Sequence, residues 1–378
     1  MSTDIPFNRP PLAGTELEFL RQVLEDRRLE GHGRFTREAQ ERLQAMTGCR
    51  KTLLTHSCTS ALEMSALLCQ VGPGDEVILP SYTFVSTASA VALRGATPVF
   101  VDIRPDTLNL DAALIAPAIT SKTKAIFTVH YAGIASDPLA MQKVAAAHGL
   151  RLVEDAAQCL GASYRGQPLG SFGDLATLSF HATKNITSGE GGALLINNES
   201  LIERAEIIWE KGTNRKQFVR GQVDKYTWVD LGSSYLPSEV TAALLLAQLG
   251  KIDEITRDRL ATWDRYNDAL GDLETADLLR RPVVPEGCAH NGHIYYVLLP
   301  TAEKRDAALR ALVSAGVKAQ FHYIPLHLSP AGQTYGRAHG GLPVTCDLAA
   351  RLLRLPLWYG MGEEVDSVIA TLRRALGA

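Results

Sequence analysis

The sequence predicts an α/β fold built on a large, mainly parallel, seven-stranded sheet. Seven short runs rich in Val, Ile, Leu and Phe lie between residues 51 and 197: KTLLTH, EVILP, TPVFVDI, AIFTVH, RLVEDAA, LATLSFH and GALLIN. They do not alternate between apolar and polar residues, which is typical of strands covered on both faces. Helix-forming segments such as 59–71 and 137–150 separate several of the runs, as expected when helices connect parallel strands.

A smaller α+β domain is expected after the sheet. Apolar residues from Ile252 to Leu270 recur at roughly helical spacing and predict a connecting helix. The segments HIYYVLLP (293–300) and VKAQFHYIP (317–325), a helix-like stretch at 301–316 and two terminal helical stretches follow it. With 378 residues to accommodate, we expect a large domain over 1–250 and a small one over 251–378.

The composition favours small molecules as ligands. The chain is 46% apolar and 21% charged, with a net charge of −3 and no basic stripe, so neither nucleic acid nor an anionic membrane is expected as a partner. The start, MSTDIPFNRPPLAG, is unlike a signal peptide, and no long apolar run is present, so a cytoplasmic protein is expected. Six cysteines without a C-x-x-C pair indicate neither a disulfide framework nor a metal site.

Polar residues directly after the strand runs are the candidates for ligand binding, because ligands bind at the carboxyl ends of strands in such sheets. Cys58 and Thr59 open a helix after the first run, where free amides suit a phosphate, although a plain Ser/Thr helix cap explains the same residues. Phe84 follows the second run. It is suited to lie against a planar ring, and equally to fill the core.

A carboxylate pair ends the strand RLVED. Asp155 leaves a buried strand end, and Gln158 follows it. A buried carboxylate requires a partner, and a cationic ring nitrogen is a good one. The alternative, that Asp155 caps the next helix, has about equal weight.

The stretch LSFHATKNITSGEGG contains a single lysine, Lys184, shortly after a strand that ends near Ser179. Its glycines follow the lysine, so the pattern is not the phosphate-binding G-x-x-x-x-G-K-[ST] loop. A solvated surface lysine is the ordinary interpretation. A lysine held rigidly between a strand end and a glycine-rich turn also suits Schiff-base chemistry.

The four places together match one cofactor. Pyridoxal 5′-phosphate requires a lysine to attach to, an acid at its ring nitrogen, a flat neighbour for the ring and a helix N-terminus for its phosphate. The sequence offers a candidate for each, directly after a strand.

SFHATKNITSGEGG, EDAAQ, PSYTFVSTASAVALRGATPVFVDI, FHYIPLH and RLLRLPLW resemble the DegT/DnrJ/EryC1/StrS family of sugar-nucleotide aminotransferases, of fold type I. The likeness covers nearly the whole chain. It implies that Lys184 attaches the cofactor and moves protons, that Asp155 pairs with the ring nitrogen, and that Gln158 and Phe84 flank the ring. It also implies that Cys58, Thr59 and Ser179 hold the phosphate.

Residues 210–249 look especially like a subgroup acting on dTDP-4-oxo-6-deoxy-D-glucose. That resemblance implies L-glutamate as donor, dTDP-4-amino-4,6-dideoxy-D-galactose as product, a role in precursors of enterobacterial common antigen and related polysaccharides, and a homodimer with the active site at its interface. Candidate substrate contacts are His181, Arg215, Tyr323 and His327. His181 also suits a structural role. Alternatives are a C3 or equatorial C4 amine, a related dehydratase, which Lys184 disfavours, and a non-catalytic binder.

Overall fold

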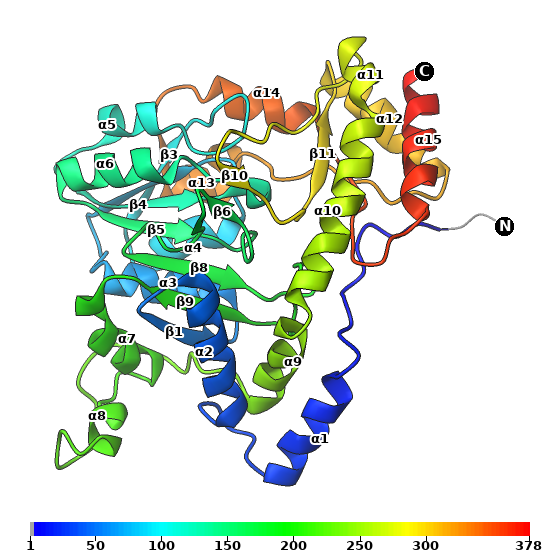
Figure 1. The fold of residues 1–378 in the computed structure, drawn as a ribbon. Coiled ribbons are helices and arrows are strands. Elements are labelled where there is room, and N and C mark those ends of the chain that lie inside the picture. Colours follow the sequence, from blue (N-terminus) through cyan, green and yellow to red (C-terminus); the bar gives the residue numbers. More distant parts are fainter. Residues whose placement is uncertain (1–3) are drawn as a thin grey trace.

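The computed structural model describes residues 4–378 and contains the expected sheet (Figure 1). Each of the seven apolar runs forms a strand, and a short eighth strand joins the edge. The order is β1 (Lys51–Thr55), β9 (Gly192–Ile196), β8 (Leu175–Ser179), β5 (Arg151–Asp155), β4 (Thr123–Val129), β2 (Glu76–Pro80), β3 (Thr97–Val101) and β12 (Arg337–Ala338). Only β9 runs antiparallel to its neighbours in this sheet. The fold class is confirmed, while the expected count of seven strands is corrected to eight because β12 pairs with β3 from far along the chain.

Helices cover both faces of the sheet (Figure 1). Successive strand residues point to opposite faces: Val77 and Leu79 of β2 pack with one group of helices, and Ile78 between them packs with the other. The first face carries α3 (Cys58–Leu68), α4 (Val85–Ala92) and α7 (Ile202–Trp209). The second carries α1 (Glu16–Asp26), α2 (Arg34–Thr47), α5 (Ile115–Ala118), α6 (Pro138–His148) and α9 (Glu239–Leu249). This arrangement explains why the strands read as continuous apolar runs.

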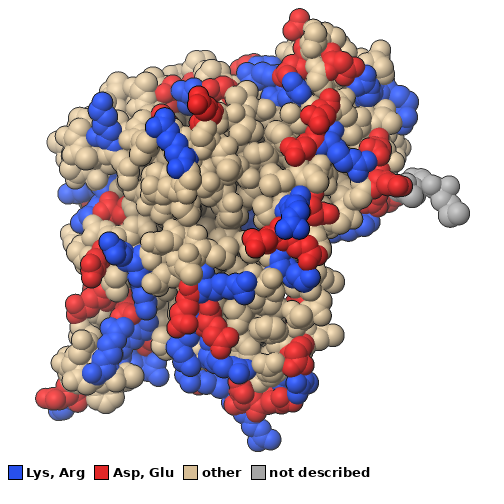
Figure 2. Space-filling model, viewed as in Figure 1, with Lys and Arg blue, Asp and Glu red and all other residues tan. Residues whose placement is uncertain are grey.

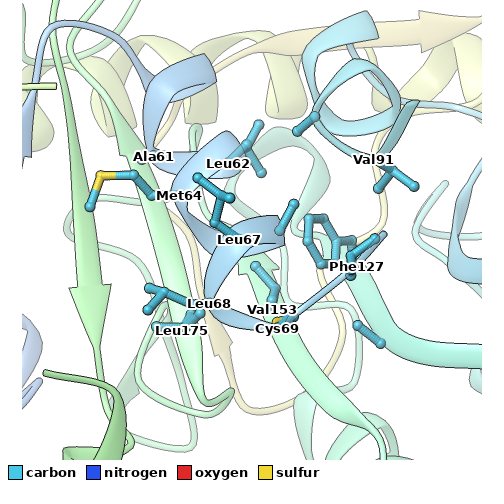
Figure 3. Packing of buried hydrophobic residues seen from close by; sticks show 14 of the residues in the cluster. Ala61, Leu62, Met64, Leu67, Leu68, Cys69, Val91, Phe127, Val153 and Leu175 are labelled. Atoms are coloured by element: carbon cyan, nitrogen blue, oxygen red, sulfur yellow. The ribbon is translucent and has the colours of Figure 1, made fainter. Parts of the chain in front are cut away.

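Helix α3 is held firmly against the sheet. Its apolar residues surround most of the helix and lie with Phe127, Val153 and Leu175 of three neighbouring strands (Figure 3). Ala61, Met64 and Ala66 are completely buried. Burial of this kind stabilises a side chain by about 1.5–3 kcal/mol for the larger residues, so the N-terminus of α3 is fixed relative to the strand ends.

The C-terminal part begins with the expected long helix. α10 (Ile252–Ala269) runs from the sheet layer to α11 (Gly271–Thr275), α12 (Ala302–Ser314) and α15 (Glu364–Leu376) (Figure 1). These helices pack around β11 (Tyr295–Leu298) and β13 (Leu352–Leu355), which pair antiparallel. We propose a domain boundary at 250/251, between α9 and α10.

Helix α8 (Arg215–Val219) follows α7 and contacts it on the sheet side. The elements that connect the two parts are α13 (Pro330–Tyr335), α14 (Pro343–Arg351), and a small sheet of β10 (Cys288–Ala289), β6 (Ser163–Tyr164) and β7 (Gln167–Pro168). Ile5 packs in the C-terminal core, and β12 joins the large sheet. The chain therefore crosses between the two parts more than once.

The surface carries both charge signs. Figure 2 shows Lys and Arg interspersed with Asp and Glu over the face in view. Within residues 4–378, no helix combines the length and apolar character needed to cross a bilayer. All six cysteines are free thiols, of which Cys49, Cys69 and Cys159 are buried.

Candidate active site

A cavity of about 1100 Å³ opens at the carboxyl ends of the central strands. Residues from the sheet side and from the C-terminal part line it together, so it lies where the two parts meet. The sheet side contributes Cys58, Thr59, Phe84, Asp155, Gln158, Ser179, His181 and Lys184, and the C-terminal part contributes His293, Gln320, His322, Tyr323 and Arg354. Ligand sites commonly lie between domains and at strand ends.

The N-terminus of α3 offers unpaired amides to this cavity. Ser57 caps the helix by accepting a hydrogen bond from the Ser60 amide at 3.1 Å. Among the described residues, the amides of Cys58 and Thr59 meet no acceptor. Such amides, together with the helix dipole, attract an anion. The Thr59 hydroxyl, 2.7 Å from the Ser86 hydroxyl, adds a polar group at the same place.

One glycine of the GEGG stretch, Gly192, is required by the close packing of β9 against the start of α3. It lies in β9, the second strand from the edge of the sheet, and pairs with Ser179 on one side and with Thr55 on the other. A Cβ at this position would collide with the backbone of Ser57 and Cys58, including the Ser57 carbonyl oxygen at 2.5 Å. Only glycine lets β9 approach the start of α3 so closely, which places Ser179 beside the free amides.

Asp155 lies at the end of β5 and is almost fully buried. Its Oδ2 accepts a hydrogen bond from the Thr87 hydroxyl at 2.7 Å, and its Oδ1 accepts one from the Ala157 amide at 3.2 Å. Burial raises the pKa of this carboxyl above its ordinary value, and no cationic side chain of residues 4–378 is hydrogen-bonded to it. A protonated ring nitrogen in the cavity would satisfy it.

Lys184 lies in the turn after β8, and its amide donates to the His181 carbonyl at 2.9 Å. Burial lowers the pKa of its ammonium group below the ordinary value, and the nearby Asp155 charge partly opposes this effect. A lysine that loses its proton readily can act as a nucleophile and as a base near neutral pH.

Phe84 and Gln158 line the same cavity, Phe84 as an exposed ring and Gln158 as a side chain held by two hydrogen bonds. Phe84 precedes α4, is 56% exposed and lines the cavity, so its ring is accessible to a ligand there. Gln158 is held at both ends: its Oε1 accepts from the Ala132 amide at 2.6 Å, and its Nε2 donates to the Tyr323 hydroxyl at 2.9 Å. The bond to Gln158 places the Tyr323 hydroxyl beside a candidate cofactor-binding residue.

Of the other three candidate substrate contacts, one lines the large cavity and two do not. His181 lines the cavity, and its Nδ1 lies 2.9 Å from the Thr183 hydroxyl, so both interpretations of this residue have support. His327 lies outside the lining, with Nδ1 2.7 Å from the Ser81 hydroxyl. Arg215 lines a different cavity and pairs with Glu210 at 3.2 Å. The single chain therefore does not bring Arg215 or His327 to the large cavity, because α8 and the 326–328 turn point elsewhere.

Sequence reasoning missed several residues of the site. Thr87 supports Asp155, His322 stacks on Tyr323 with ring centroids 3.7 Å apart, and Arg354 lines the wall. His322 and Arg354 lie within the quoted FHYIPLH and RLLRLPLW segments, so their motifs were the available signal. Asn8, which donates to the Ala182 carbonyl at 3.2 Å, lies in the N-terminal segment IPFNRPPLAG, where no single residue was selected.

The arrangement fits pyridoxal 5′-phosphate. Free amides at a helix N-terminus suit its phosphate, an unpaired buried carboxylate suits its ring nitrogen, a free aromatic face suits its ring, and a lysine with a lowered pKa suits its aldehyde. Within residues 4–378, the α3 amides have no acceptor and the Asp155 carboxyl has no counter-ion, which leaves both available to a ligand.

Comparison with known proteins agrees with this fit. Residues 11–373 match the model of the DegT/DnrJ/EryC1/StrS aminotransferase family. GDP-perosamine synthase of Caulobacter vibrioides is 32% identical over 372 residues, covering 97% of both chains. The aminotransferase TlmJ of Streptoalloteichus hindustanus superimposes with a TM-score of 0.91 at 33% identity, covering 99% of both chains.

A third relative bears on the cofactor. The putative sugar aminotransferase Spr1654 of Streptococcus pneumoniae, in its PLP form, superimposes with a TM-score of 0.90 at 30% identity, covering 99% of both chains. The matched family spans nearly all of the chain. The chain thus belongs to the DegT/DnrJ/EryC1/StrS aminotransferase family and is a sugar aminotransferase that depends on pyridoxal 5′-phosphate.

Proposed function

We propose that this enzyme transfers the amino group of L-glutamate to dTDP-4-oxo-6-deoxy-D-glucose. The products are 2-oxoglutarate and dTDP-4-amino-4,6-dideoxy-D-galactose, a precursor of a cell-surface polysaccharide of the enterobacterial common antigen type. The observation that carries the proposal is the convergence of Lys184 and Asp155 on one cavity of about 1100 Å³. The subgroup-like segment 210–249 supports the choice of sugar.

Hydrogen-bond donors hold the phosphate of the cofactor, whereas an aromatic ring and a carboxylate hold its pyridine ring. In this proposal the amides of Cys58 and Thr59 and the Ser179 hydroxyl bind the phosphate, and Phe84 covers one face of the ring. Asp155, as the carboxylate, keeps a proton on the ring nitrogen. When bound, pyridoxal 5′-phosphate supplies an electron-accepting ring and carries the amino group from donor to sugar.

Lys184 carries protons in both half-reactions, as a base at the amino acid and as an acid at C4 of the sugar. In the first, its neutral amine removes the proton from Cα of glutamate. In the second, the same group delivers a proton to C4 of the sugar, and the face of delivery sets an axial or equatorial amine. A lysine must be neutral to accept a proton, and burial lowers the pKa of Lys184 in the needed direction.

The test is an incubation with glutamate and each of two keto-sugar nucleotides. We expect conversion of dTDP-4-oxo-6-deoxy-D-glucose, with an axial C4 amine in the product NMR spectrum. A C3 amine or an equatorial C4 amine would replace our stereochemical assignment. The name GDP-perosamine synthase makes a GDP-linked keto sugar the informative second substrate, and preference for it would refute the choice of nucleotide.

We also propose a homodimer in which the segment around α8 reaches the partner's cavity. This segment exposes several large apolar side chains: Phe218, Val219, Tyr226, Trp228, Val229 and Leu231. Contiguous exposed apolar residues commonly mark an interface. Arg215 at the start of α8 would then serve the neighbouring site rather than its own.

Mixing two inactive variants tests the dimer. Lys184→Ala and Arg215→Ala homodimers are combined, exchanged and assayed. If Arg215 serves the partner's site, mixed dimers contain one complete site and recover activity. If Arg215 serves its own site, both sites of a mixed dimer lack a residue, and no activity returns.

A further inference from the structure

The segment 290–293 connects helix α10 of the C-terminal part to the lysine turn. Arg259 of α10 is 1% exposed, and it donates from Nε to the Gly292 carbonyl at 3.1 Å and from Nη2 to the His293 carbonyl at 2.6 Å. Gly292 has a left-handed φ of 59°, and a Cβ there would lie 3.0 Å from the Arg259 backbone. Only glycine permits this approach, so α10 fixes the backbone that carries the His293 side chain.

The His293 imidazole is held by the residue that follows Lys184. Its Nδ1 lies 2.9 Å from Asn185 Oδ1, and both side chains are buried. Asn185 Nδ2 donates to the Asn291 carbonyl at 2.9 Å, so its Oδ1 is the atom that faces the imidazole. Because an amide oxygen only accepts, Nδ1 of His293 must carry the proton. The lone pair of the neutral imidazole is then on Nε2, which makes no hydrogen bond with residues 4–378.

His293 and Lys184 are close neighbours. Both line the large cavity, and both line a second cavity of about 10 Å³ together with Ser179 and Gln158. A space of this size holds at most one water molecule, so the residues that enclose it adjoin each other. The Lys184 amine donates no hydrogen bond to residues 4–378. It therefore has an imidazole with a free acceptor beside it.

Charges from several elements keep that imidazole neutral. Burial lowers the pKa of His293 well below its usual range, and nearby cations add to this effect. The groups that oppose a charge on His293 are Lys184, Arg259, Arg354 and His322. Burial also lowers the pKa of Lys184, and the groups that act on it from other elements are Cys58, Asp155, Arg354 and Cys159. Of the two neighbours, only the lysine can carry the proton.

We propose that His293 is the positioning residue of Lys184: its Nδ1–H holds the turn through Asn185, and its Nε2 accepts a hydrogen bond from the lysine amine whenever that amine is free. This inference rests on the proposed function, in which Lys184 moves protons. A lysine that has taken up a proton must stay near the place of delivery, and an acceptor in a fixed position keeps it there. A hydrogen bond to the ammonium also favours the charged form, so His293 opposes the loss of the proton that burial promotes.

Two substitutions separate the two contacts of the imidazole. In His293→Asn, the side-chain amide lies near the position of Nδ1 and keeps a donor for Asn185, while nothing replaces Nε2. In His293→Gln, the longer side chain places an amide oxygen near the position of Nε2 and gives up the donor to Asn185. His290→Asn is the matched control, because it makes the same change in the same segment at a histidine that lines neither cavity.

The readout is the reactivity of the Lys184 amine rather than turnover. The full-length enzyme is loaded with pyridoxamine 5′-phosphate, which has no aldehyde and leaves this amine free. Cyanate carbamylates only the neutral form of an amine, and mass spectrometry of the peptide that contains Lys184 gives its labelling rate from mildly acidic to alkaline pH. Circular dichroism and cofactor content establish that each variant is folded and loaded.

We expect cyanate to label Lys184 about 3- to 10-fold faster in His293→Asn than in the wild type at mildly acidic pH, because the ammonium form loses its acceptor. At alkaline pH the two rates should be equal, since the amine is neutral in both proteins. His293→Gln should follow the wild-type labelling profile, although it should unfold at a lower urea concentration because its turn is less firmly held. His290→Asn should follow the wild-type profile as well.

Nitrogen NMR of the histidine-labelled wild type provides a measurement that requires no variant to fold. His293 should be the neutral tautomer with its proton on Nδ1 throughout the same pH range. A proton on Nε2 would remove the acceptor and overturn the proposal.

Two labelling results would also overturn it. They are a His293→Asn profile that superimposes on that of the wild type, and an equal change in both His293 variants, which would indicate that His293 acts only through the packing of the turn. Reaction of the wild type with L-glutamate tests the proposed function separately. If the labelling profiles are as expected and glutamate does not react, the proposed donor is refuted and the contact between His293 and Lys184 is retained.

Discussion

Gly192→Ala tests how the sheet builds the cofactor site. Gly192 lies in β9 between Thr55 and Ser179, directly under the start of α3. Its added Cβ would meet the backbone of Ser57 and Cys58, with the Ser57 carbonyl oxygen at 2.5 Å. Because these are backbone atoms between a strand and a buried helix, no side-chain rotation relieves the contact.

The magnitude follows from the geometry. The Ser57 carbonyl must retreat by at least about 0.5 Å to reach a tolerable contact, and overpacking of this kind costs about 1–3 kcal/mol. We expect Gly192→Ala to lower the free energy of unfolding by about 2–3 kcal/mol. The same shift should turn the Cys58 and Thr59 amides away from the proposed phosphate position, and we expect cofactor binding to weaken by about 10- to 100-fold.

Urea unfolding of the cofactor-free proteins and titration with pyridoxal 5′-phosphate measure the two effects. Gly191→Ala is the matched control, because its Cβ would meet mainly the rotatable Ser188 hydroxyl, with the Phe180 Cβ at an ordinary 3.4 Å. It should cost less than about 1 kcal/mol. If Gly192→Ala were as stable as this control and bound the cofactor with wild-type affinity, the close approach would not be what selects glycine.

Other predictions concern the charged groups of the site. Lys184→Met should reduce transamination by at least about 10³-fold, because it removes the amine proposed to move the proton. Single-turnover absorbance changes with glutamate measure the loss, and near-wild-type turnover would refute the assignment. Asp155→Asn should also be nearly inactive, yet its cofactor-free form should be more stable than the wild type above about pH 4, the ordinary pKa range of Asp. Burial raises the pKa of Asp155, so folding disfavours its ionised form. The stability that Asp155→Asn gains over the wild type should be absent at lower pH and grow as pH rises through the folded pKa. Melting temperatures that show the opposite trend would contradict this reasoning. Glu154→Gln should lose about 3 kcal/mol of stability in urea unfolding, because the buried Glu154 carboxylate accepts bonds from His130 and from three backbone amides at 2.6–3.0 Å; an unchanged midpoint would contradict it.

Sequence patterns predicted where the strands lie along the chain, but not which strands pair with each other. The seven apolar runs became strands because a continuous apolar run of four to seven residues satisfies both faces of a covered sheet. The order in which they pair was not encoded in any run, since pairing joins residues far apart, as when β1 meets β9. The two-residue β12 is too short to produce a periodic signal, and its pairing with β3 depends on the path of the preceding chain.

The same division holds within the site. Lys184, Asp155 and Phe84 were predictable because each follows a strand, and the carboxyl ends of parallel strands meet at one edge of the sheet. What the sequence by itself determined was therefore the chemistry available at that edge. Only the tertiary structure decided that Arg354 lines the cavity with no ion-pair partner among residues 4–378, while Arg215 pairs with Glu210. Whether a charge is satisfied depends on groups brought near it from distant parts of the chain, and local patterns carry no record of those groups.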